Sequence, residues 1–375
     1  MENTIALYIH IPFCKQKCLY CDFPSFACKD SYMLEYAKAL CKEISIHRDK
    51  IISSIFIGGG TPTYLSLSCL ELIAKAIAEL KFTKDIEFTI EGNPDSLTKE
   101  KLILLKKMGV NRLSIGLQAW QEVLLKRLGR VHNTEQFITA YSTSRSLGFN
   151  NINIDLMFGL PGQSLDMWKE TLEKITELKP EHISAYGLIV EEDTDFYKLQ
   201  ERDLLLLPEE DIEREMYHYS VEFLKKKGYF QYEISNFSLE GFQCRHNLIY
   251  WNLEEYIGCG SAAHSFKDNF RYRNTSNIEK YIEDINENLS AVEEKTYNLK
   301  EDTMEEFMFM GLRKTKGISV KNFKERFHTD IYSVYSSVIN KYLKNNMLIL
   351  NNDNLYLSPK GIELSNQVMC EFILK

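Results

Sequence analysis

The chain has 375 residues, of which 44% are hydrophobic and 26% are charged, and its net charge is −8. This acidity argues against general nucleic-acid binding, because a phosphate backbone would repel the protein. The sequence contains no apolar run of about 18 residues, so no membrane span is expected.

Residues 1–11 have neither a basic region nor a small-residue cleavage site, so export is not expected. Nine cysteines in a large chain that is not exported are not typical of a disulfide framework. We therefore expect a cytoplasmic protein whose cysteines are free thiols or metal ligands.

Short apolar runs alternate with amphipathic stretches in the first half of the chain. The expected strands are Ala6–His10, Ser54–Gly58, Ile86–Glu91, Arg112–Gln118, Asn151–Leu156 and His182–Ile189. The expected helices are Tyr32–His47, Ser66–Leu80, Thr98–Met108, Gln121–Leu128, Thr134–Leu147, Ser164–Leu178 and Glu209–Lys227. This alternation predicts an α/β fold with a parallel sheet. Six units are too few for a closed eight-stranded barrel, so we predict an open, partial (β/α)6 TIM-type barrel.

The pattern predicts three parts, namely a core over residues 1–235, a connecting region over 236–300 and a C-terminal domain over 301–375. In the last part, helices are expected at Thr303–Leu312, Val320–Phe327, Ile331–Lys344 and Pro359–Leu374, with a hairpin over 347–357. These elements resemble a small, mainly helical winged-helix domain. A structural or docking role is favoured over DNA binding because the chain is acidic.

Three cysteines follow the first expected strand closely. Cys14, Cys18 and Cys21 form a CxxxCxxC pattern, and converging thiolates select an iron–sulfur cluster or zinc. A structural zinc site takes four protein ligands, whereas three thiolates leave one iron of a cluster open to a small molecule. The spacing therefore favours a cluster, with zinc as the alternative.

Polar and glycine residues also follow the other expected strands. The segment 58–62 follows the second strand, Glu91 and Asn93 end the third, Gln118 ends the fourth, and Asp155 lies near the end of the fifth. Functional groups of a parallel barrel gather where its strands end, and glycines let a ligand approach the backbone closely. We expect a binding site at this rim.

Taken together, these segments resemble the radical SAM superfamily. The matching segments are 8–14, the cysteine triplet, 58–63, 91–94, 114–118, 128–130 and 155–161, in order over roughly residues 5–235. The resemblance implies a [4Fe-4S] cluster held by Cys14, Cys18 and Cys21, with S-adenosylmethionine (SAM) exchangeably bound to the open iron.

The resemblance also implies the residues that surround SAM. Those expected to line the SAM site are Tyr8, Tyr20, Gly59, Gly60, Thr61 and Glu91, and those expected in the same cavity are Gln118, Arg130 and Asp155. Carboxylates can hold ribose hydroxyls, and an arginine can pair with a carboxylate. The alternative role for Tyr8 is a core aromatic.

More narrowly, the chain is similar to oxygen-independent coproporphyrinogen III oxidases and to the related HemW haem chaperones. The oxidases have a further cysteine where this chain has Phe23, and a longer N-terminal segment before the triplet. The segment from His246 to Trp251 instead fits the HNxxYW motif of the HemW branch. These differences favour HemW.

The motif implies a haem site. His246 can supply a neutral imidazole to iron, Asn247 can orient that ring or a propionate, and Tyr250 and Trp251 offer flat apolar faces. Cys244 is an alternative thiolate ligand. The structural alternative is a buried His–Asn pair with the two aromatic residues in the core.

We therefore expect a haem-binding and haem-transferring protein on a radical SAM scaffold. Its expected partners are haem, acceptors such as respiratory haem proteins, and an electron donor, and relatives imply a monomer–dimer equilibrium. The alternatives are oxidative decarboxylation of coproporphyrinogen III, haem degradation by radical methyl transfer, and nucleic-acid binding through the C-terminal domain.

Overall fold

A computed structural model describes residues 4–374 of the chain. Its main sheet has twelve strands in the order β12-β11-β10-β9-β1-β2-β3-β4-β5-β6-β8-β7. The parallel centre consists of β1 (Thr4–Ile11), β2 (Ile51–Gly59), β3 (Lys81–Gly92), β4 (Arg112–Gln118), β5 (Ile152–Phe158) and β6 (His182–Gly187). The sheet has two free edges, so the expected open, partial barrel is confirmed.

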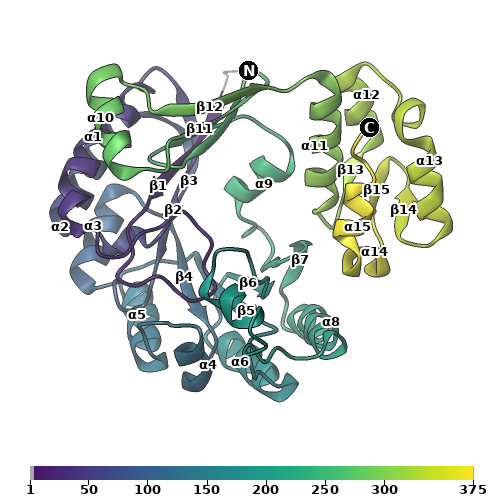
Figure 1. The fold of residues 1–375 in the computed structure, drawn as a ribbon, viewed down its shortest axis with the longest axis horizontal. Helices are drawn as coiled ribbons and strands as arrows, with labels where there is room; N and C mark the ends of the chain where they lie inside the picture. The colour runs from purple at the N-terminus through teal and green to yellow at the C-terminus, as the bar shows by residue number, and fades with distance from the viewer. Residues whose placement is uncertain (1–3, 375) are drawn as a thin grey trace.

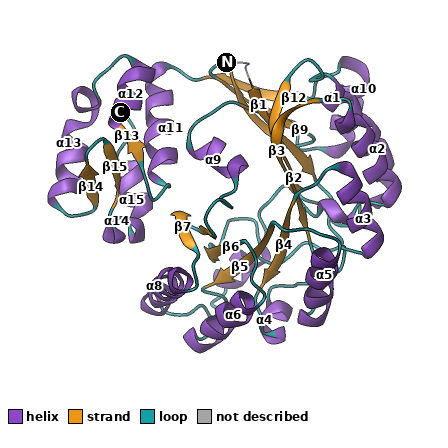
Figure 2. Cartoon of the chain, turned by 180° about the vertical axis from the view of Figure 1, so that it is seen from behind, coloured by secondary structure: helices purple, strands orange, loops and turns teal. Residues whose placement is uncertain are grey.

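Helices cover the outer face of this curved sheet (Figures 1 and 2). They are α1 (Met33–Ser45), α2 (Leu67–Ala78), α3 (Lys99–Met108), α4 (Glu122–Arg127), α5 (Thr134–Ser146), α6 (Leu165–Glu177) and α8 (Glu210–Lys226). The connections contain α7 (Asp195–Gln200) and the 3-10 turns η1 (Asp30–Tyr32) and η2 (Pro62–Tyr64). The Thr98 and Ser164 side chains cap α3 and α6, and α3 ends at Gly109 in the left-handed region.

Successive residues along each central strand point to opposite faces of the sheet. On β1, Leu7 and Ile9 join the buried apolar core under the helices. Tyr8 and His10 point to the opposite face, where they contact each other, and Tyr8 also stacks on Phe56 of β2. The inner face is therefore polar and aromatic, which suits a ligand site better than a second apolar core.

The segment over 236–300, expected as a connecting region, extends the main sheet. Beyond β6 the sheet continues with β8 (Asn236–Ser238) of this segment and then with β7 (Phe230–Glu233), which precedes the segment in the chain. At the other edge lie β9 (Tyr256–Cys259), which pairs in parallel with β1, and then β10 (His264–Lys267), β11 (Phe270–Asn274) and β12 (Val292–Tyr297). The helices of this segment are α9 (Arg245–Trp251) and α10 (Ile278–Asn288).

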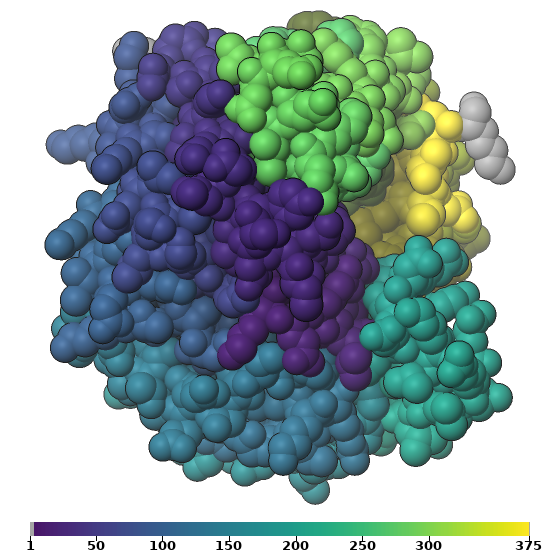
Figure 3. All heavy atoms as spheres, turned by 60° about the vertical axis from the view of Figure 1, so that its left-hand side comes forward, coloured from purple at the N-terminus to yellow at the C-terminus, as the bar shows by residue number. Residues whose placement is uncertain are grey.

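A buried carboxylate holds this extension against the first helix. Glu43 of α1 accepts hydrogen bonds from the Gly260 N–H at 2.7 Å, the Tyr281 hydroxyl at 2.6 Å and the Asn274 amide at 2.7 Å. In Figure 3 the purple N-terminal residues accordingly reach the surface directly beside the green segment that contains α10.

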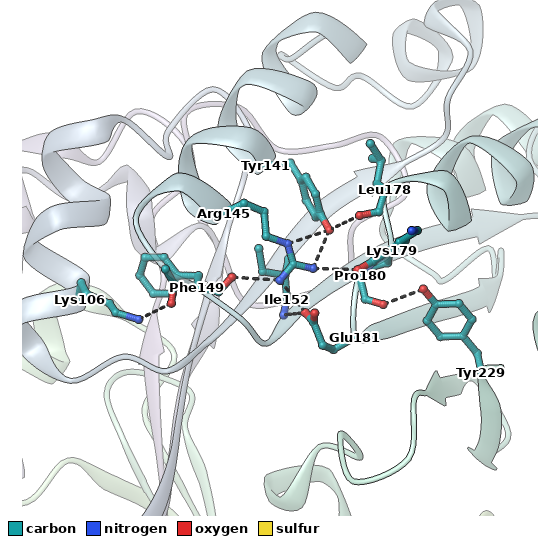
Figure 4. A network of polar contacts seen from close by, with 11 residues as sticks. Lys106, Tyr141, Arg145, Phe149, Ile152, Leu178, Lys179, Pro180, Glu181 and Tyr229 are labelled. Atoms are coloured by element: carbon teal, nitrogen blue, oxygen red, sulfur yellow. Dashed lines mark hydrogen bonds and ion pairs between the residues drawn. The ribbon is translucent and has the colours of Figure 1, made fainter. Parts of the chain in front are cut away.

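A second polar network joins α5 to β6 (Figure 4). The Arg145 guanidinium donates to the Phe149 carbonyl at 3.0 Å, the Lys179 carbonyl at 3.0 Å and the Tyr141 hydroxyl at 2.7 Å. It also lies 2.9 Å from Glu181, which accepts the Ile152 N–H at the start of β5. The Arg145 side chain thus holds the end of α5, the end of α6 and the start of β5 together. Only the planar guanidinium, with its several N–H donors, can reach all of these acceptors.

Replacing Arg145 by lysine is therefore expected to destabilise the protein by about 1–3 kcal/mol, because a lysine keeps the charge but cannot reach all these acceptors. Urea unfolding followed by circular dichroism measures the loss. Arg202→Lys is the matched control, because Arg202 is exposed. Equal midpoints for the two variants would contradict the assigned role of the network.

The C-terminal domain has its own apolar core and lies beside the open sheet (Figure 1). Its elements are α11 (Lys300–Leu312), β13 (Ile318–Ser319), α12 (Val320–Phe327), α13 (Ile331–Lys344), β14 (Leu348–Asn351), β15 (Asn354–Leu357), α14 (Pro359–Glu363) and α15 (Ser365–Cys370). Its small sheet is antiparallel in the order β13-β15-β14, which is the expected winged-helix-like arrangement. The single final helix expected over 359–374 is wrong, since non-helical backbone at Leu364 separates α14 from α15.

Specific contacts join this domain to the rest of the chain. Arg271 of β11 forms a two-pronged ion pair with Glu306 of α11, at 2.6 and 2.8 Å. The Ile234 N–H donates to the Arg313 carbonyl at 3.1 Å, and the Thr315 N–H donates to the Tyr232 carbonyl at 3.1 Å. Among residues 4–374, no helix is long and apolar enough to cross a membrane.

Candidate functional site

Backbone hydrogen bonds anchor the loop of the three cysteines at both ends. The Cys14 N–H donates to the Phe26 carbonyl at 3.0 Å, and the Thr61 N–H donates to the Phe13 carbonyl at 2.8 Å. Farther along, the Leu19 N–H donates to the Leu128 carbonyl at 3.1 Å. The loop is therefore tied to β2 and to the end of α4, so its thiols lie over the rim of the sheet.

A chain of polar contacts connects two of the cysteines across the strand ends. The Cys14 sulfur lies 3.5 Å from the Thr61 hydroxyl, which accepts the Asn93 amide at 3.1 Å. The Arg130 guanidinium donates to Asn93 Oδ1 at 2.6 Å and lies 3.5 Å from the Cys18 sulfur. Arg130 also donates to the Gly116 carbonyl at 2.7 Å, so β2, β3 and β4 all hold this ring of residues.

At the end of β2, Gly59 and Gly60 lie so close to neighbouring groups that there is no room for a side chain. A Cβ atom at Gly60 would lie 2.9 Å from the Cys14 sulfur, and one at Gly59 would lie 2.6 Å from the His10 ring. Gly59 also has φ of +111°, which disfavours any other residue. The glycine run thus lets the backbone pass directly beneath the cysteine loop.

The Tyr8–His10 pair links β1 to the cysteine loop. The His10 Nε2 atom lies 2.9 Å from the Pro24 carbonyl, which can only accept, so Nε2 carries the proton. His10 Nδ1 then accepts the Tyr8 hydroxyl at 2.9 Å. Burial lowers the pKa of His10 to about 4, so this neutral ring holds the cysteine loop through the Pro24 carbonyl.

Two carboxylates lie on the inner face of the sheet close to this rim. Burial and the nearby Asp155 raise the pKa of Glu91 to about 8. Asp155 accepts hydrogen bonds from the Ser114 hydroxyl at 3.0 Å and the Asn153 amide at 2.8 Å, and burial raises its pKa too. Burial disfavours the charged form of both acids, and a ligand that brings hydroxyl donors or positive charge would stabilise that form.

The remaining residues expected around SAM also lie near this rim. Gln118 ends β4 with φ of +73°, a strained conformation for a residue that is not glycine. Tyr20 packs against Phe196 of α7, and burial raises its pKa. The structure thus brings Thr61 and Arg130 against the cysteine loop, with Asn93 between them.

The HNxxYW segment folds as α9, which lies between the inner face of the sheet and the C-terminal domain (Figures 1 and 2). Glu87 of β3 accepts the N–H groups of Arg245 and His246 at 3.0 and 2.9 Å and so fixes the start of the helix. His246 is 1% exposed, and burial lowers the pKa of its imidazole to about 3. Its ring is therefore neutral, the form that binds iron.

The motif residues do not all face the same way. Tyr250 contacts the His246 ring, with the ring centroids 5.0 Å apart, and then Tyr256 of β9 at 4.6 Å. Trp251 instead lies under the Arg313 guanidinium, 4.6 Å from its ring centroid, beside a pocket of about 550 Å³ against the C-terminal domain. Asn247 is half-buried on the same helix. His246 and Tyr250 thus form one unit, while Trp251 belongs to the domain junction.

Cys244 is a poor candidate for a thiolate ligand. Its sulfur is buried 3.5 Å from Glu87, and burial raises the pKa of its thiol to about 12. The thiol therefore stays protonated and packs as part of the helix anchor.

Several residues that build the site were not selected from the sequence. Ser54 and Glu87 contact α9, and both lie at alternate positions on predicted strands. Polar residues at every second position of a buried strand are the signal that could have identified Ser54 and Glu87. A strand that is buried on both faces would otherwise be apolar throughout. Their partners on α9 lie more than 150 residues away.

Comparison with known proteins gives the family. Residues 8–175 match the Radical SAM superfamily, and residues 299–364 match the HemN C-terminal domain. The chain is 38% identical to "Heme chaperone HemW" of Lactococcus lactis subsp. lactis (strain IL1403), covering 100% of this chain and 98% of that protein. It is 39% identical to "Heme chaperone HemW" of Bacillus subtilis (strain 168), covering 98% and 99%. The chain belongs to the HemW family.

The fold is similar to that of coproporphyrinogen III oxidase (HemN) from Escherichia coli, with a TM-score of 0.87, 21% identity, and coverage of 99% of this chain and 90% of that one. At this identity the likeness supports the fold alone. The HemW family is part of the radical SAM superfamily, which uses a [4Fe-4S] cluster and SAM.

The cysteine loop fits such a cluster. Cys14, Cys18 and Cys21 lie on one short loop, and the Cys18 and Cys14 sulfurs add to burial in raising the pKa of Cys21. Within residues 4–374, no three His, Cys, Asp or Glu side chains are already arranged to hold a metal ion. Thiols that hinder one another's ionisation are a suitable donor set for iron, which would relieve that repulsion.

Proposed function

We propose that this chain is a haem chaperone, which binds haem and passes it to acceptor proteins, on a scaffold that holds a [4Fe-4S] cluster and SAM. The observation that carries the proposal is α9, on which the HNxxYW motif presents a neutral His246 beside Tyr250 on the inner face of the sheet. The printed names of the relatives support the same function.

Within this proposal, Cys14, Cys18 and Cys21 are the cluster ligands. When bound, the cluster supplies an electron to SAM. Arg130 would balance the negative charge of the thiolates, because its guanidinium already lies 3.5 Å from Cys18. Gly59, Gly60 and Thr61 would let SAM lie against the backbone, with Tyr8, Tyr20, Gln118 and Asp155 around it. Glu91 would accept the ribose hydroxyls.

The proposal includes acceptors such as respiratory haem proteins, an electron donor for the cluster, and a monomer–dimer equilibrium in the cytoplasm. None of these requires nucleic acid, which the acidic composition disfavours.

The raised pKa of Glu91 gives a pH-dependent prediction for SAM binding. Because its pKa is about 8, the carboxyl is mostly protonated at pH 7 and becomes the better acceptor for ribose hydroxyls as the pH rises. SAM affinity of the cluster-loaded protein should therefore rise between pH 7 and 9, by up to about tenfold per unit below the pKa, and then level off. Equilibrium dialysis with labelled SAM measures it.

Glu91→Gln is the control for this pH dependence. It should bind SAM more weakly and should lose the rise in affinity that the Glu91 carboxylate provides. A rise of the same size in both proteins would assign the pH dependence to SAM itself and would remove Glu91 from the proposed site.

The function is tested against the oxidase alternative with the porphyrin substrate. Cluster-loaded protein with SAM and a reductant should leave coproporphyrinogen III unchanged over many equivalents. Repeated turnover to protoporphyrinogen IX would establish an oxidative decarboxylase and overturn the proposal.

A further inference from the structure

Both ring nitrogens of His246 are engaged by hydroxyl groups. Nδ1 lies 2.8 Å from the Ser54 Oγ atom of β2, and Nε2 lies 2.8 Å from the Tyr250 hydroxyl one helical turn along α9. A neutral imidazole carries one proton, so one hydroxyl must accept and the other must donate. The distances alone allow both arrangements.

We infer that Ser54 is a positioning residue, which accepts the Nδ1 proton of His246 and leaves Nε2 as the acceptor of the Tyr250 hydroxyl. Tyr250 then occupies the atom that would bind haem iron, until haem displaces it. This inference rests on the proposed function, because it assumes that His246 is the haem ligand.

The surroundings of the ring are rigid on the Ser54 side. Ser54 is 1% exposed on a central strand, and the His246 ring also packs against Phe56 of β2, with centroids 5.3 Å apart. The backbone N–H of His246 is held by Glu87 of β3 at 2.9 Å. The main chain, the ring face and Nδ1 are therefore all fixed by the sheet.

The partner on the other side of the ring comes from α9 itself. Tyr250 lies near the end of the short helix α9 and is half-buried, with its ring against Tyr256. Rotation of this side chain would free Nε2 and would leave the Ser54 contact in place. A hydrogen bond from a fixed partner to the far nitrogen is how proteins orient histidine ligands of metals.

A related arrangement occurs at His182 on the inner face, where the partner of Nδ1 is an amide oxygen and so fixes the direction of both hydrogen bonds. His182 Nδ1 lies 2.6 Å from Asn153 Oδ1, whose amide group donates to Ser114 and Asp155, so Nδ1 carries the proton. His182 Nε2 then accepts the Tyr232 hydroxyl at 2.8 Å. His182 is thus an internal standard for the protonation that we infer for His246.

The inference predicts opposite effects for two variants. Ser54→Ala removes the orienting partner and should weaken haem binding about 10- to 100-fold. Tyr250→Phe keeps the aromatic face but frees Nε2, and should strengthen haem binding about two- to tenfold. Loss of packing alone would weaken binding in both variants.

These opposite changes in haem affinity are tested by haem titration of the wild type, Ser54→Ala, Tyr250→Phe and the control Ser144→Ala. Ser144 is a matched control, because it is also buried and its hydroxyl bonds only within helix α5, to the Ala140 carbonyl. The midpoint potential of the bound haem adds a second readout and should rise in Ser54→Ala, where the imidazole loses a partner that makes it more electron-donating. Weaker binding by Tyr250→Phe, or no change in Ser54→Ala, would overturn the inference.

Nitrogen-15 spectra of the haem-free protein test the protonation directly. Long-range proton–nitrogen correlations should show Nε2 of His246 without a proton, as for His182, and Ser54→Ala should change the His246 signals only. A protonated Nε2 on His246 would contradict the inference. His246→Ala distinguishes failure of this inference from failure of the proposed function. Unchanged haem binding in His246→Ala would refute His246 as the haem ligand. Unchanged haem binding in Ser54→Ala and Tyr250→Phe would refute only the roles inferred for Ser54 and Tyr250.

Discussion

Replacing Cys18 by serine is expected to abolish the iron–sulfur absorption of anaerobically reconstituted protein. A three-ligand cluster already has one open iron, so losing another thiolate leaves two ligands and a hard hydroxyl in place of the third. The same result is expected for Cys14→Ser and Cys21→Ser. Iron and sulfide analysis with absorption near 400 nm measures the loss, and SAM binding should fall with it.

Cys28→Ser is the matched control for this experiment. Cys28 lies on the segment after the triplet but is exposed, so its loss should leave iron content and spectrum unchanged. Loss of the cluster in Cys28→Ser, or full iron content in any triplet variant, would mean that the ligand set is wrong. Zinc in place of iron in anaerobically prepared protein would contradict the cluster itself.

Replacing His246 by alanine is expected to abolish saturable haem binding by the cluster-loaded protein. The variant removes the proposed axial ligand and leaves Ser54 and Tyr250 without their shared partner. Because Glu87 holds the backbone rather than the ring at this position, α9 should still form. Titration with haem, followed by absorption in the Soret region, measures the affinity and the stoichiometry.

His218→Gln is the control for non-specific haem binding. His218 is on α8 with half of its side chain exposed, 3.0 Å from Glu363, and such surface pairs contribute little to stability. This variant should bind haem as wild type does. A loss of haem binding in His218→Gln, or its retention in His246→Ala with an intact cluster, would move the haem site away from α9.

The parallel core was predictable because its signals are local. Each central strand is an apolar run, and helix caps such as Ser164 lie beside the residues that they serve. To predict that the cysteine triplet and the polar strand ends lie together, only one further rule was needed, namely that parallel strands end at the same rim. The contacts from Cys14 through Thr61 and Asn93 to Arg130 confirm that residues following different strands meet at this rim.

The setting of α9 could not be predicted, because it depends on contacts distant in sequence. Nothing near His246 indicates that Ser54 will lie beside its ring, since 192 residues separate them. The motif also does not indicate that Trp251 contacts the Arg313 guanidinium at the domain junction, while Tyr250 contacts the His246 ring. Helical geometry separates neighbouring residues by about 100°, so the Tyr250 and Trp251 side chains leave α9 in different directions.

Long-range pairing also explains the region over 236–300. Its strands are short, and β9 has only four residues, so hydrophobic alternation is weak there. These strands form because β1 offers a free edge, with Tyr8 opposite Gly258. The order of strands in the sheet, rather than local propensity, determines this part of the fold.

The most direct test of haem delivery is a transfer measurement. Cluster-loaded protein carrying one equivalent of haem is mixed with an apo haem protein whose holo form absorbs at a distinct wavelength, with apomyoglobin in excess as a parallel trap for free haem. We predict that haem moves to a respiratory apo acceptor faster than to the trap, and that His246→Ala delivers none. Transfer to both at the same rate would mean passive release of haem and would contradict a chaperone.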